Sequence, residues 1–294
     1  MSLSKFLQSG FMPLFVRFAP SALGRAVFQF LGTLYYNVAN RKERRLIRRN
    51  VRDLLRTAWN KKGGTVTGEV FEGIFDHYYE KLLLAAKPAD YLEKFLRRRV
   101  ALVHEDVIRR SQERRKGTLL VTAHWGAEEL IPAILYLRGY PVTVILETST
   151  ERLRKILESQ TAGRDVELLF ASDPEGVLGK ILDALARGRV LVTQCDEVDA
   201  WRRRRNRTIQ LFGHTLFFDH TLDFIAHRSG ASVAAVFCRR FTGLRYRLIC
   251  EEIAPDGAAA QDVARRSLSL WERYTLEAPE QWHQWKKWAE MKVI

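Results

Sequence analysis

Short, mostly apolar runs alternate with helix-prone segments through the middle of the chain, and this alternation limits the choice of fold most. Each run has the length of a buried strand and is too short for a buried helix; the runs are Leu119–Ala123, Val142–Leu146, Glu167–Phe170 and Val190–Thr193. Parallel strands need a crossover connection, usually a helix, between each pair. The sequence therefore predicts an α/β fold in which a mostly parallel central sheet is flanked by helices.

Polar residues stand at the ends of two of these runs. His124 comes directly after the first run, and Asp196 follows Val190–Thr193 at a similar relative place. The carboxyl ends of parallel strands form the edge at which open α/β sheets place their ligands. We therefore expect His124 and Asp196 to meet in space, although they are far apart in the sequence.

A second carboxylate lies close to His124 in the sequence. Glu129 is five residues further on, in the first turns of the helix expected after Gly126. From there its carboxylate can point back at the imidazole ring. A histidine held by a carboxylate is a competent general base near neutral pH. The local pattern also fits a histidine that only makes hydrogen bonds within a loop.

Acidic and basic residues crowd the segment after Val190–Thr193. Asp196, Glu197 and Asp199 could together hold a divalent metal ion, as in a metal-dependent phosphoesterase, or they could form a solvated loop. Five arginines follow within Trp201–Arg207. Guanidinium groups suit phosphates, so this cluster is a candidate for binding a phosphorylated headgroup, sugar or acyl carrier.

The composition is that of a globular protein with a polyanionic partner. Of 294 residues, 47% are hydrophobic and 28% are charged, and the formal net charge is +14. That charge suits nucleic acid or an anionic membrane surface. The sequence has no helix-turn-helix, RNP or zinc-finger context, so we expect no nucleic-acid partner. The three cysteines fit neither a disulfide framework nor a zinc site, which indicates a reducing compartment.

The N-terminal part of the chain is apolar first and basic afterwards. Residues 5–38 contain Pro13 and Pro20, which disfavour a membrane-spanning helix, although apolar residues recur at helical spacing from Ser21. This helix either packs on the core or lies in the membrane interface. The eight cations between Arg41 and Arg56 would each add up to about 1 kcal/mol of attraction near an anionic leaflet.

These patterns divide the chain in two. We take residues 1–60 as an amphipathic, basic helical segment that associates with a membrane. Residues 61–294 form the α/β domain. Within that domain, residues 90–115 are basic and helix-prone.

The segment His124–Glu129 reads His-Trp-Gly-Ala-Glu-Glu directly after a strand. It resembles the signature of the lipid A biosynthesis (late, or secondary) acyltransferase family, which belongs to the lysophospholipid acyltransferase superfamily. Trp125–Gly126 is close to the usual aromatic-glycine pair of that family. The likeness extends from about residue 10 to 290; its other features are a basic segment ending in Asn50–Val51, the pair Phe212–Gly213, an apolar strand ending in Arg239, and the closing segment Pro279–Trp282.

The resemblance implies an acyltransferase that moves a fatty acyl group from an acyl-carrier-protein or coenzyme A thioester to a hydroxyl of a lipid or glycolipid, such as a lipid A precursor. His124 would be the general base, and Glu129 would orient its ring. Backbone N–H groups near Trp125 and Gly126 would bind the oxyanion. The residues expected to bind substrate are Trp125, Gly126, Asp196, Arg202, Arg204, Phe212 and Gly213.

The resemblance also implies partners and a location. We expect no metal and no cofactor, because a thioester is already activated. The expected partners are the carrier or coenzyme A thioester, the lipid acceptor and an anionic membrane surface. The expected place is the cytoplasmic face of the bacterial inner membrane, where the protein would be peripheral or monotopic.

One position departs from the family pattern. Family members commonly carry an arginine just after the second strand, where Leu146–Thr148 stands here, so Arg152 or Arg154 is a candidate replacement. The open alternatives are a metal-dependent phosphoesterase and a non-enzymatic, basic membrane-binding protein.

Overall fold

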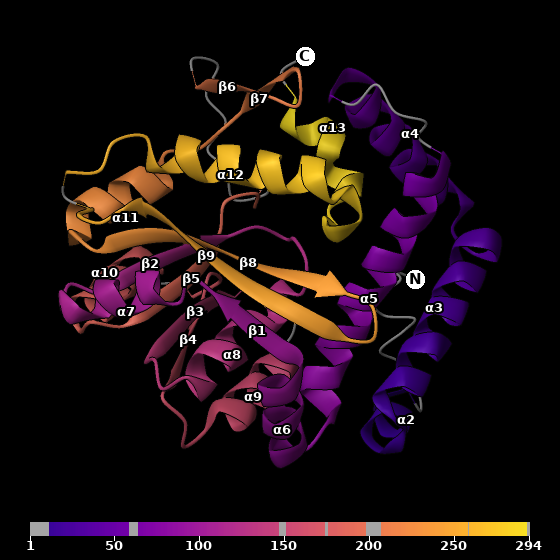
Figure 1. The fold of residues 1–294 in the computed structure, drawn as a ribbon, viewed down its shortest axis with the longest axis horizontal. Helices are drawn as coiled ribbons and strands as arrows, with labels where there is room; N and C mark the ends of the chain where they lie inside the picture. The colour runs from indigo at the N-terminus through magenta and orange to yellow at the C-terminus, as the bar shows by residue number, and fades with distance from the viewer. Residues whose placement is uncertain are drawn as a thin grey trace.

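A seven-stranded sheet forms the centre of the molecule (Figure 1). The computed structural model describes residues 12–58, 64–146, 151–173, 176–197, 207–257 and 259–292. The strand order is β1-β9-β8-β2-β5-β3-β4. The strands of this sheet are β1 (Val100–Val103), β2 (Thr118–Thr122), β3 (Val142–Leu146), β4 (Val166–Phe170), β5 (Val190–Gln194), β8 (Ser232–Phe241) and β9 (Arg245–Ala254).

Five neighbouring strands of the sheet run in one direction. β8, β2, β5, β3 and β4 pair in parallel, whereas β9 is antiparallel to β8 and carries β1 in parallel beside it. The predicted α/β class with a mostly parallel central sheet is confirmed. A separate antiparallel hairpin joins β6 (Thr208–Leu211) to β7 (His214–Phe217).

Helices cover both faces of the sheet. In Figure 1 the long helix α12 lies above β8 and β9, and α8 and α9 lie below β3 and β4. The α-helices are α2 (Met12–Phe18), α3 (Ser21–Val38), α4 (Arg41–Ala58), α5 (Gly64–Ala86), α6 (Ala89–Arg99), α7 (Asp106–Glu113), α8 (Ile131–Leu137), α9 (Glu151–Thr161), α10 (Leu178–Ala186), α11 (Thr221–Ser229), α12 (Val263–Glu277) and α13 (Trp288–Met291). Short 3₁₀ turns are η1 (Glu128–Leu130), η3 (Pro279–Gln281) and η4 (Trp285–Lys287).

The basic stretch at residues 90–115, which the sequence marks as helix-prone, is helical only in part. It holds α6, then β1, then α7. Val100–Val103 pairs with Tyr246–Ile249 of β9, and this long-range pairing overrides the helix propensity of the arginine-rich flanks. The strand is only four residues long, which leaves little periodic signal in the sequence.

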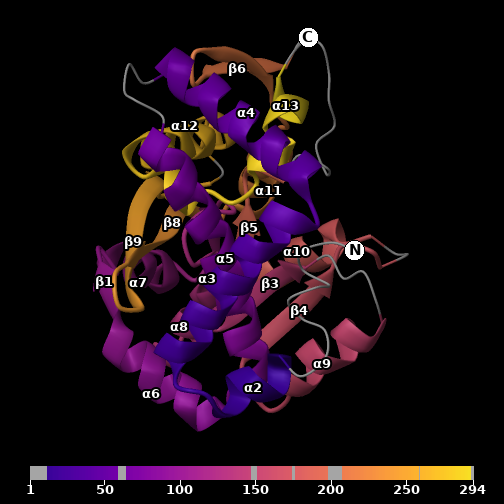
Figure 2. The same ribbon diagram turned by 90° about the vertical axis from the view of Figure 1, so that its right-hand side faces the viewer.

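The N-terminal helices pack against the same core as the sheet (Figure 2). On α3, the missing side chain of Gly32 lets the Phe75 ring of α5 approach, because a Cβ there would lie 2.4 Å from that ring. On α4, the side-chain amide of Asn50 donates a 2.8 Å hydrogen bond to the backbone oxygen of Trp285. One hydrophobic core therefore runs across the boundary expected at residue 60, and that boundary stays a prediction.

A helix that crosses a bilayer needs about 20 consecutive, mostly apolar residues. Among the described residues, none of the helices has the length and apolar character needed to span a membrane.

Candidate active site

His124 and Asp196 meet at the carboxyl edge of the sheet, as the sequence predicts. Parallel pairing of β2 with β5 sets Thr122 beside Gln194, so the residues that follow both strands leave the sheet together. The backbone N–H of His124 donates to Oδ1 of Asp196 at 3.0 Å, and Nδ1 of the ring lies 3.1 Å from the same oxygen. Two adjacent strand ends have thus built one histidine–carboxylate pair.

Asp196 is buried and its second oxygen is occupied. The indole N–H of Trp282 donates to Oδ2 at 2.8 Å. Burial by itself would raise the pKa of this carboxyl group, but the charge of His124 and the hydrogen bonds from His124 and Trp282 bring it below its ordinary value. An ionised Asp196 can only accept, so Nδ1 of His124 is the donor and Nε2 is left to react.

This occupancy argues against the metal-dependent phosphoesterase. Both oxygens of Asp196 already receive N–H donors within the chain. Oδ1 faces two donors and Oδ2 faces one, so little of the carboxylate is left to coordinate a metal ion. Asp199, the third acid of that proposed set, lies outside the described residues.

The other ring nitrogen of His124 faces a second carboxylate. Nε2 lies 3.5 Å from Oε2 of Glu197, and Oε1 of Glu197 lies 3.4 Å from Nζ of Lys287. Burial lowers the pKa of His124, but Asp196, followed by Glu128 and Glu197, outweighs it and raises the pKa to about 9. The imidazole is therefore mostly protonated at neutral pH before substrate arrives. Its side chain remains 15% exposed.

Glu129 does not hold the His124 ring, which corrects the expectation drawn from the sequence. Its carboxylate forms a 2.7 Å ion pair with Lys81 of α5. The reason is local: residues 128–130 form the 3₁₀ turn η1 rather than the first turn of a regular α-helix. Burial raises the pKa of Glu129, and the charge of Lys81 more than offsets this.

The neighbouring acid, Glu128, lies in a buried histidine cluster that the sequence did not suggest. Its Oε1 is 3.0 Å from Nε2 of His283 and 3.4 Å from Nδ1 of His77. Ligand atoms of these three residues lie within 4.8 Å of one another, so the cluster could hold a metal ion. The two imidazole rings are stacked, however, with centroids 3.7 Å apart and planes 16° apart.

The lone pair of an imidazole nitrogen lies in the plane of its ring. In two stacked rings these planes are nearly parallel, so the two lone pairs do not converge on one metal position. A metal would require one ring of the cluster to turn, so the present arrangement fits a metal poorly. Burial lowers the pKa of His283 to about 3, which keeps that ring neutral. The backbone N–H of His283 donates to the backbone oxygen of His124 at 3.1 Å, so the cluster supports the loop that carries His124.

The loop after His124 owes its shape to Gly126. Its φ is +65°, and a Cβ there would lie 2.0 Å from the backbone oxygen of Cys238. The guanidinium of Arg240 holds the same loop: it donates to the backbone oxygen of Gly126 and to both oxygens of the buried Glu80, the latter at 2.9 Å. Only glycine satisfies this position, which explains the aromatic-glycine pair.

The backbone N–H groups near Trp125 and Gly126 are not free to bind an oxyanion, which corrects a second expectation. The N–H of Trp125 donates to Ala123 at 2.6 Å, and that of Gly126 donates to Gln281 at 2.8 Å. The Trp125 ring is fully buried against Phe237 and Tyr274. Trp125 and Gly126 therefore shape the site from behind, because neither offers a surface to a substrate.

Phe212 and Gly213, also expected to bind substrate, form the turn of the β6–β7 hairpin. The buried Phe212 ring packs edge-on against Trp271 and Trp288, at centroid distances of 4.9 and 5.5 Å. Trp271 in turn packs on Trp282, the residue that holds Asp196. The hairpin turn thus contacts the tryptophan cluster and not the His124 ring.

The remaining expected site residues divide between described and undescribed parts of the chain. Arg202 and Arg204 lie outside the described residues. Arg154, a candidate replacement for the missing family arginine, pairs with Glu158 at 3.1 Å and with Asp173 at 3.0 Å. The sequence analysis assigned no role to Trp282, Glu128, His77 or His283. Two of them stood in motifs: Trp282 in the closing segment and Glu128 in the segment His124–Glu129.

Fold and site together define an α/β protein with a buried histidine–aspartate pair at the ligand-binding edge of a parallel sheet. The sequence pattern of the bacterial lipid A biosynthesis acyltransferases matches residues 4–288, nearly the whole chain. The chain belongs to this family, and it is an acyltransferase. The family acts on lipid acceptors and is membrane-associated. No curated protein matches the chain.

Proposed function

We propose that this protein transfers a fatty acyl group from an acyl-carrier-protein or coenzyme A thioester to a hydroxyl of a lipid or glycolipid, with His124 as the general base. The observation that carries the proposal is the pairing of His124 with Asp196, whose other oxygen accepts a hydrogen bond from Trp282. This pairing fixes Nδ1 as a donor and leaves Nε2 for the proton of the acceptor.

The chemistry follows from that tautomer. Nε2 takes the proton of the acceptor hydroxyl as its oxygen attacks the thioester carbonyl. The tetrahedral intermediate then collapses, the carbon–sulfur bond breaks, and the departing thiolate takes the proton from the imidazolium. Asp196 stabilises the imidazolium throughout, and no covalent enzyme intermediate is needed because the thioester is already activated.

Glu197 occupies the space that the acceptor must enter. A hydroxyl within reach of Nε2 needs a heavy-atom distance of about 2.6–3.2 Å, and Glu197 now stands 3.5 Å from that nitrogen. Arrival of the hydroxyl would move the Glu197 carboxylate toward Lys287. Loss of the neighbouring negative charge would then lower the pKa of His124 and prepare it to act as a base.

We retain Arg202 and Arg204 as proposed ligands of acceptor phosphates, since guanidinium groups suit that role. Glu129, paired with Lys81, is better placed as part of the rim of the site. Either an acyl-carrier-protein or a coenzyme A thioester would serve as the acyl donor.

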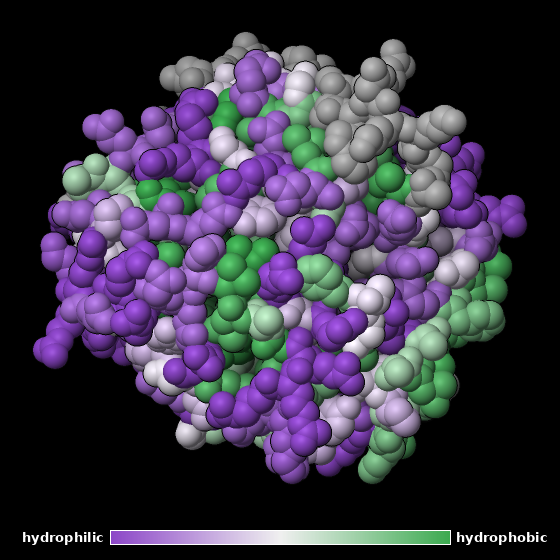
Figure 3. All heavy atoms as spheres, in the orientation of Figure 1, coloured by the Kyte–Doolittle hydropathy of each residue, from purple (hydrophilic) through white to green (hydrophobic). Residues whose placement is uncertain are grey.

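The surface over α2 and α3 supports attachment to a membrane. Figure 3 shows a hydrophobic band at the side of the molecule where these helices lie. Phe18 of α2 and Phe30 and Val38 of α3 are 75%, 69% and 66% exposed, so large apolar side chains on both helices face outward. We propose that this band lies in the cytoplasmic face of the bacterial inner membrane and makes the protein peripheral or monotopic.

Lipid mass spectrometry of cells that express the protein or His124→Ala tests the proposal. A lipid heavier by one acyl chain should appear only with the unchanged protein, and its mass would identify the acceptor. His220→Ala is a matched control, because His220 pairs with Asp223 away from this site. Identical lipid profiles, with each protein folded and membrane-bound, would remove His124 from the chemistry.

A further inference from the structure

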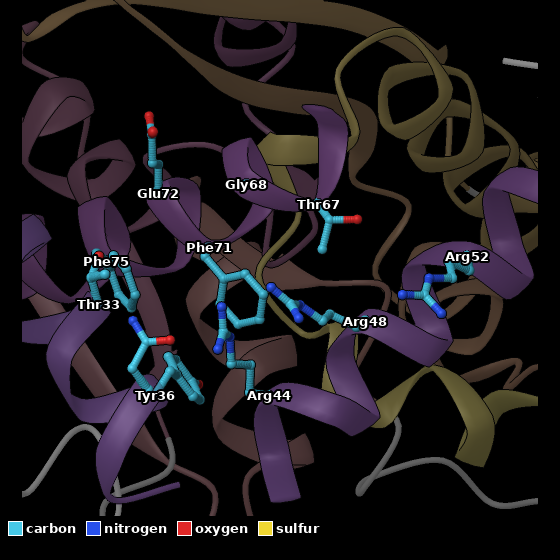
Figure 4. A pocket seen from close by; sticks show the side chains of 11 residues that line it. Thr33, Tyr36, Arg44, Arg48, Arg52, Thr67, Gly68, Phe71, Glu72 and Phe75 are labelled. Carbon is cyan, nitrogen blue, oxygen red and sulfur yellow. The ribbon is translucent and has the colours of Figure 1, made fainter. Parts of the chain in front are cut away.

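A cavity of about 740 Å³ lies between α3, α4 and α5, apart from the active site (Figure 4). Phe71 and Phe75 of α5 line it, whereas His77 and Glu80 on the same helix face the catalytic loop and its supports. Residues of an α-helix that are two or five positions apart point to different sides. The cavity and the active site are therefore on different sides of α5.

Three arginines line one wall of this cavity. Arg44, Arg48 and Arg52 are four residues apart on α4, which places them on one face of that helix. Figure 4 shows Arg44 and Arg48 extending toward the Phe71 ring. In the described part of the chain, none of the three guanidinium groups has an acidic partner.

The cavity keeps a net positive charge. Glu72 is the one carboxylate among its described lining residues, and its side chain points away from the arginines in Figure 4. Three cations in successive turns, with no acidic partner among the described residues, repel one another. Burial, followed by the charges of Arg48 and Arg41, lowers the pKa of Arg44. An anion placed among these arginines would relieve the repulsion.

The opposite wall is aromatic. The Tyr36 ring lies edge-on to Phe71, with centroids 5.1 Å apart, and 5.9 Å from Phe75. The hydroxyl of Tyr36 donates to Glu43 at 2.9 Å, so the phenol is fixed and presents its ring. A ligand of this cavity would meet cations on one side and apolar surface on the other.

The cavity opens beside the exposed apolar band of α3. Asn37 lines the cavity, and Leu34 and Phe30 lie three and seven residues before it, on the same side of the helix. These two side chains are 45% and 69% exposed. A molecule with its anionic group among the arginines can therefore lay its apolar part along this band.

We propose that the cavity binds the phosphate headgroup of an anionic membrane lipid, and that this lipid anchors the α2–α3 band in the bilayer. The site rests on the proposed membrane attachment and is separate from the acceptor at His124. One guanidinium group can donate two parallel hydrogen bonds to a phosphate. Three guanidinium groups suit a terminal phosphate, which has several free oxygens. The bound lipid would orient the catalytic edge relative to the membrane.

Vesicle flotation of the full chain tests this site. Phosphatidylcholine vesicles with and without phosphatidic acid are the probe. The variant R44Q/R48Q/R52Q should bind the phosphatidic acid vesicles about tenfold or more weakly than the unchanged protein. The matched control R41Q/R45Q/R49Q removes the same charge from positions of the same helix that do not line the cavity, and its loss should be several-fold smaller.

Each other outcome overturns the proposal. Equal losses in the two variants would mean that α4 acts only through its overall charge, and no loss in either would remove α4 from membrane binding. If inorganic phosphate binds and R44Q/R48Q/R52Q abolishes that binding without weakening vesicle binding, the site serves a soluble anion. His124→Ala should bind vesicles like the unchanged protein, which separates failure of this site from failure of the proposed acyl transfer. Circular dichroism shows whether each variant is folded.

Discussion

The indole N–H of Trp282 donates a 2.8 Å hydrogen bond to Oδ2 of Asp196, a residue 86 positions earlier in the chain. The other oxygen of that carboxylate receives the backbone N–H of His124 and faces Nδ1 of its ring. A carboxylate held from both sides cannot swing away when the imidazole gains or loses its proton. The C-terminal segment therefore sets the orientation of the proposed base.

Replacing Trp282 with phenylalanine removes the N–H and keeps most of the ring. An unmade hydrogen bond to a buried charge costs about 1–3 kcal/mol, which is about fivefold to a hundredfold in kcat if the loss falls on the transition state. We expect kcat to fall within that range with KM little changed, measured by release of the thiol from the acyl donor. Trp285→Phe is the matched control, because the Trp285 N–H is buried without an acceptor among the described residues. Equal effects of the two changes would reduce Trp282 to a packing role.

Asp196→Asn distinguishes the carboxylate that holds the ring from the one nearer in sequence. The amide no longer enforces the Nδ1–H tautomer, so we expect kcat to fall by about a thousandfold or more. Glu129→Gln should cost less than about tenfold, because Glu129 pairs with Lys81. Asp223→Asn, which removes the carboxylate beside His220 at 2.9 Å, controls for the loss of a His–Asp pair elsewhere. A far larger loss with Glu129→Gln than with Asp196→Asn would restore the dyad inferred from the sequence.

The strand ends of the site could be predicted because each is marked by a local pattern. A short apolar run followed by a polar residue identifies both His124 and Asp196, and parallel pairing then brings them together. The direction of the Glu129 side chain could not be predicted from a local pattern. Its direction depends on whether the turn after Gly126 is an α-helix or the 3₁₀ turn η1, and spacing alone does not distinguish the two.

Contacts made through tertiary structure left no such local signal. Nothing near His77 marks it as a neighbour of His283, since it stands in a helix that reads as an aromatic-rich core element. The sequence does not show that the N–H groups of Trp125 and Gly126 are occupied, because their acceptors come from the turn itself and from Gln281, far along the chain. The acyltransferase class could be inferred because the family resemblance rests on motifs that are visible in the sequence.

Gly126→Ala should destabilise the fold and abolish activity. The new Cβ would lie 2.0 Å from the backbone oxygen of Cys238, and that backbone, in the core strand β8, cannot move easily. Gly139→Ala is the matched control, because Gly139 also has a positive φ, +86°, and has no atom within 4 Å of an added Cβ. We expect the control to lose about 1 kcal/mol of unfolding free energy from backbone strain, and Gly126→Ala to lose about 3 kcal/mol or more, both measured by urea denaturation. Similar losses would show that the loop can move away from Cys238.

The rate should rise with pH until the proposed base is neutral. Burial lowers the pKa of His124, whereas Asp196, Glu128 and Glu197 together raise it to about 9. A general base acts only when deprotonated, so kcat/KM should increase about tenfold per pH unit below that value and level off near pH 9. A profile that is flat from pH 6 to 9 would mean that no base with this pKa limits the free enzyme.

Glu197→Gln tests the source of that raised pKa. It removes the negative charge 3.5 Å from Nε2 and leaves the Lys287 cation nearby, and the neighbouring His283 stays neutral. Losing the Glu197 charge while the Lys287 cation remains disfavours the imidazolium. The inflection of kcat/KM should therefore move to lower pH. Glu277→Gln, which removes a carboxylate paired with Arg239 at 3.9 Å near the surface, should leave the inflection in place. If the two variants share one pH profile, Glu197 does not control the charge of His124. The acceptor would then reach Nε2 without displacing a charged group.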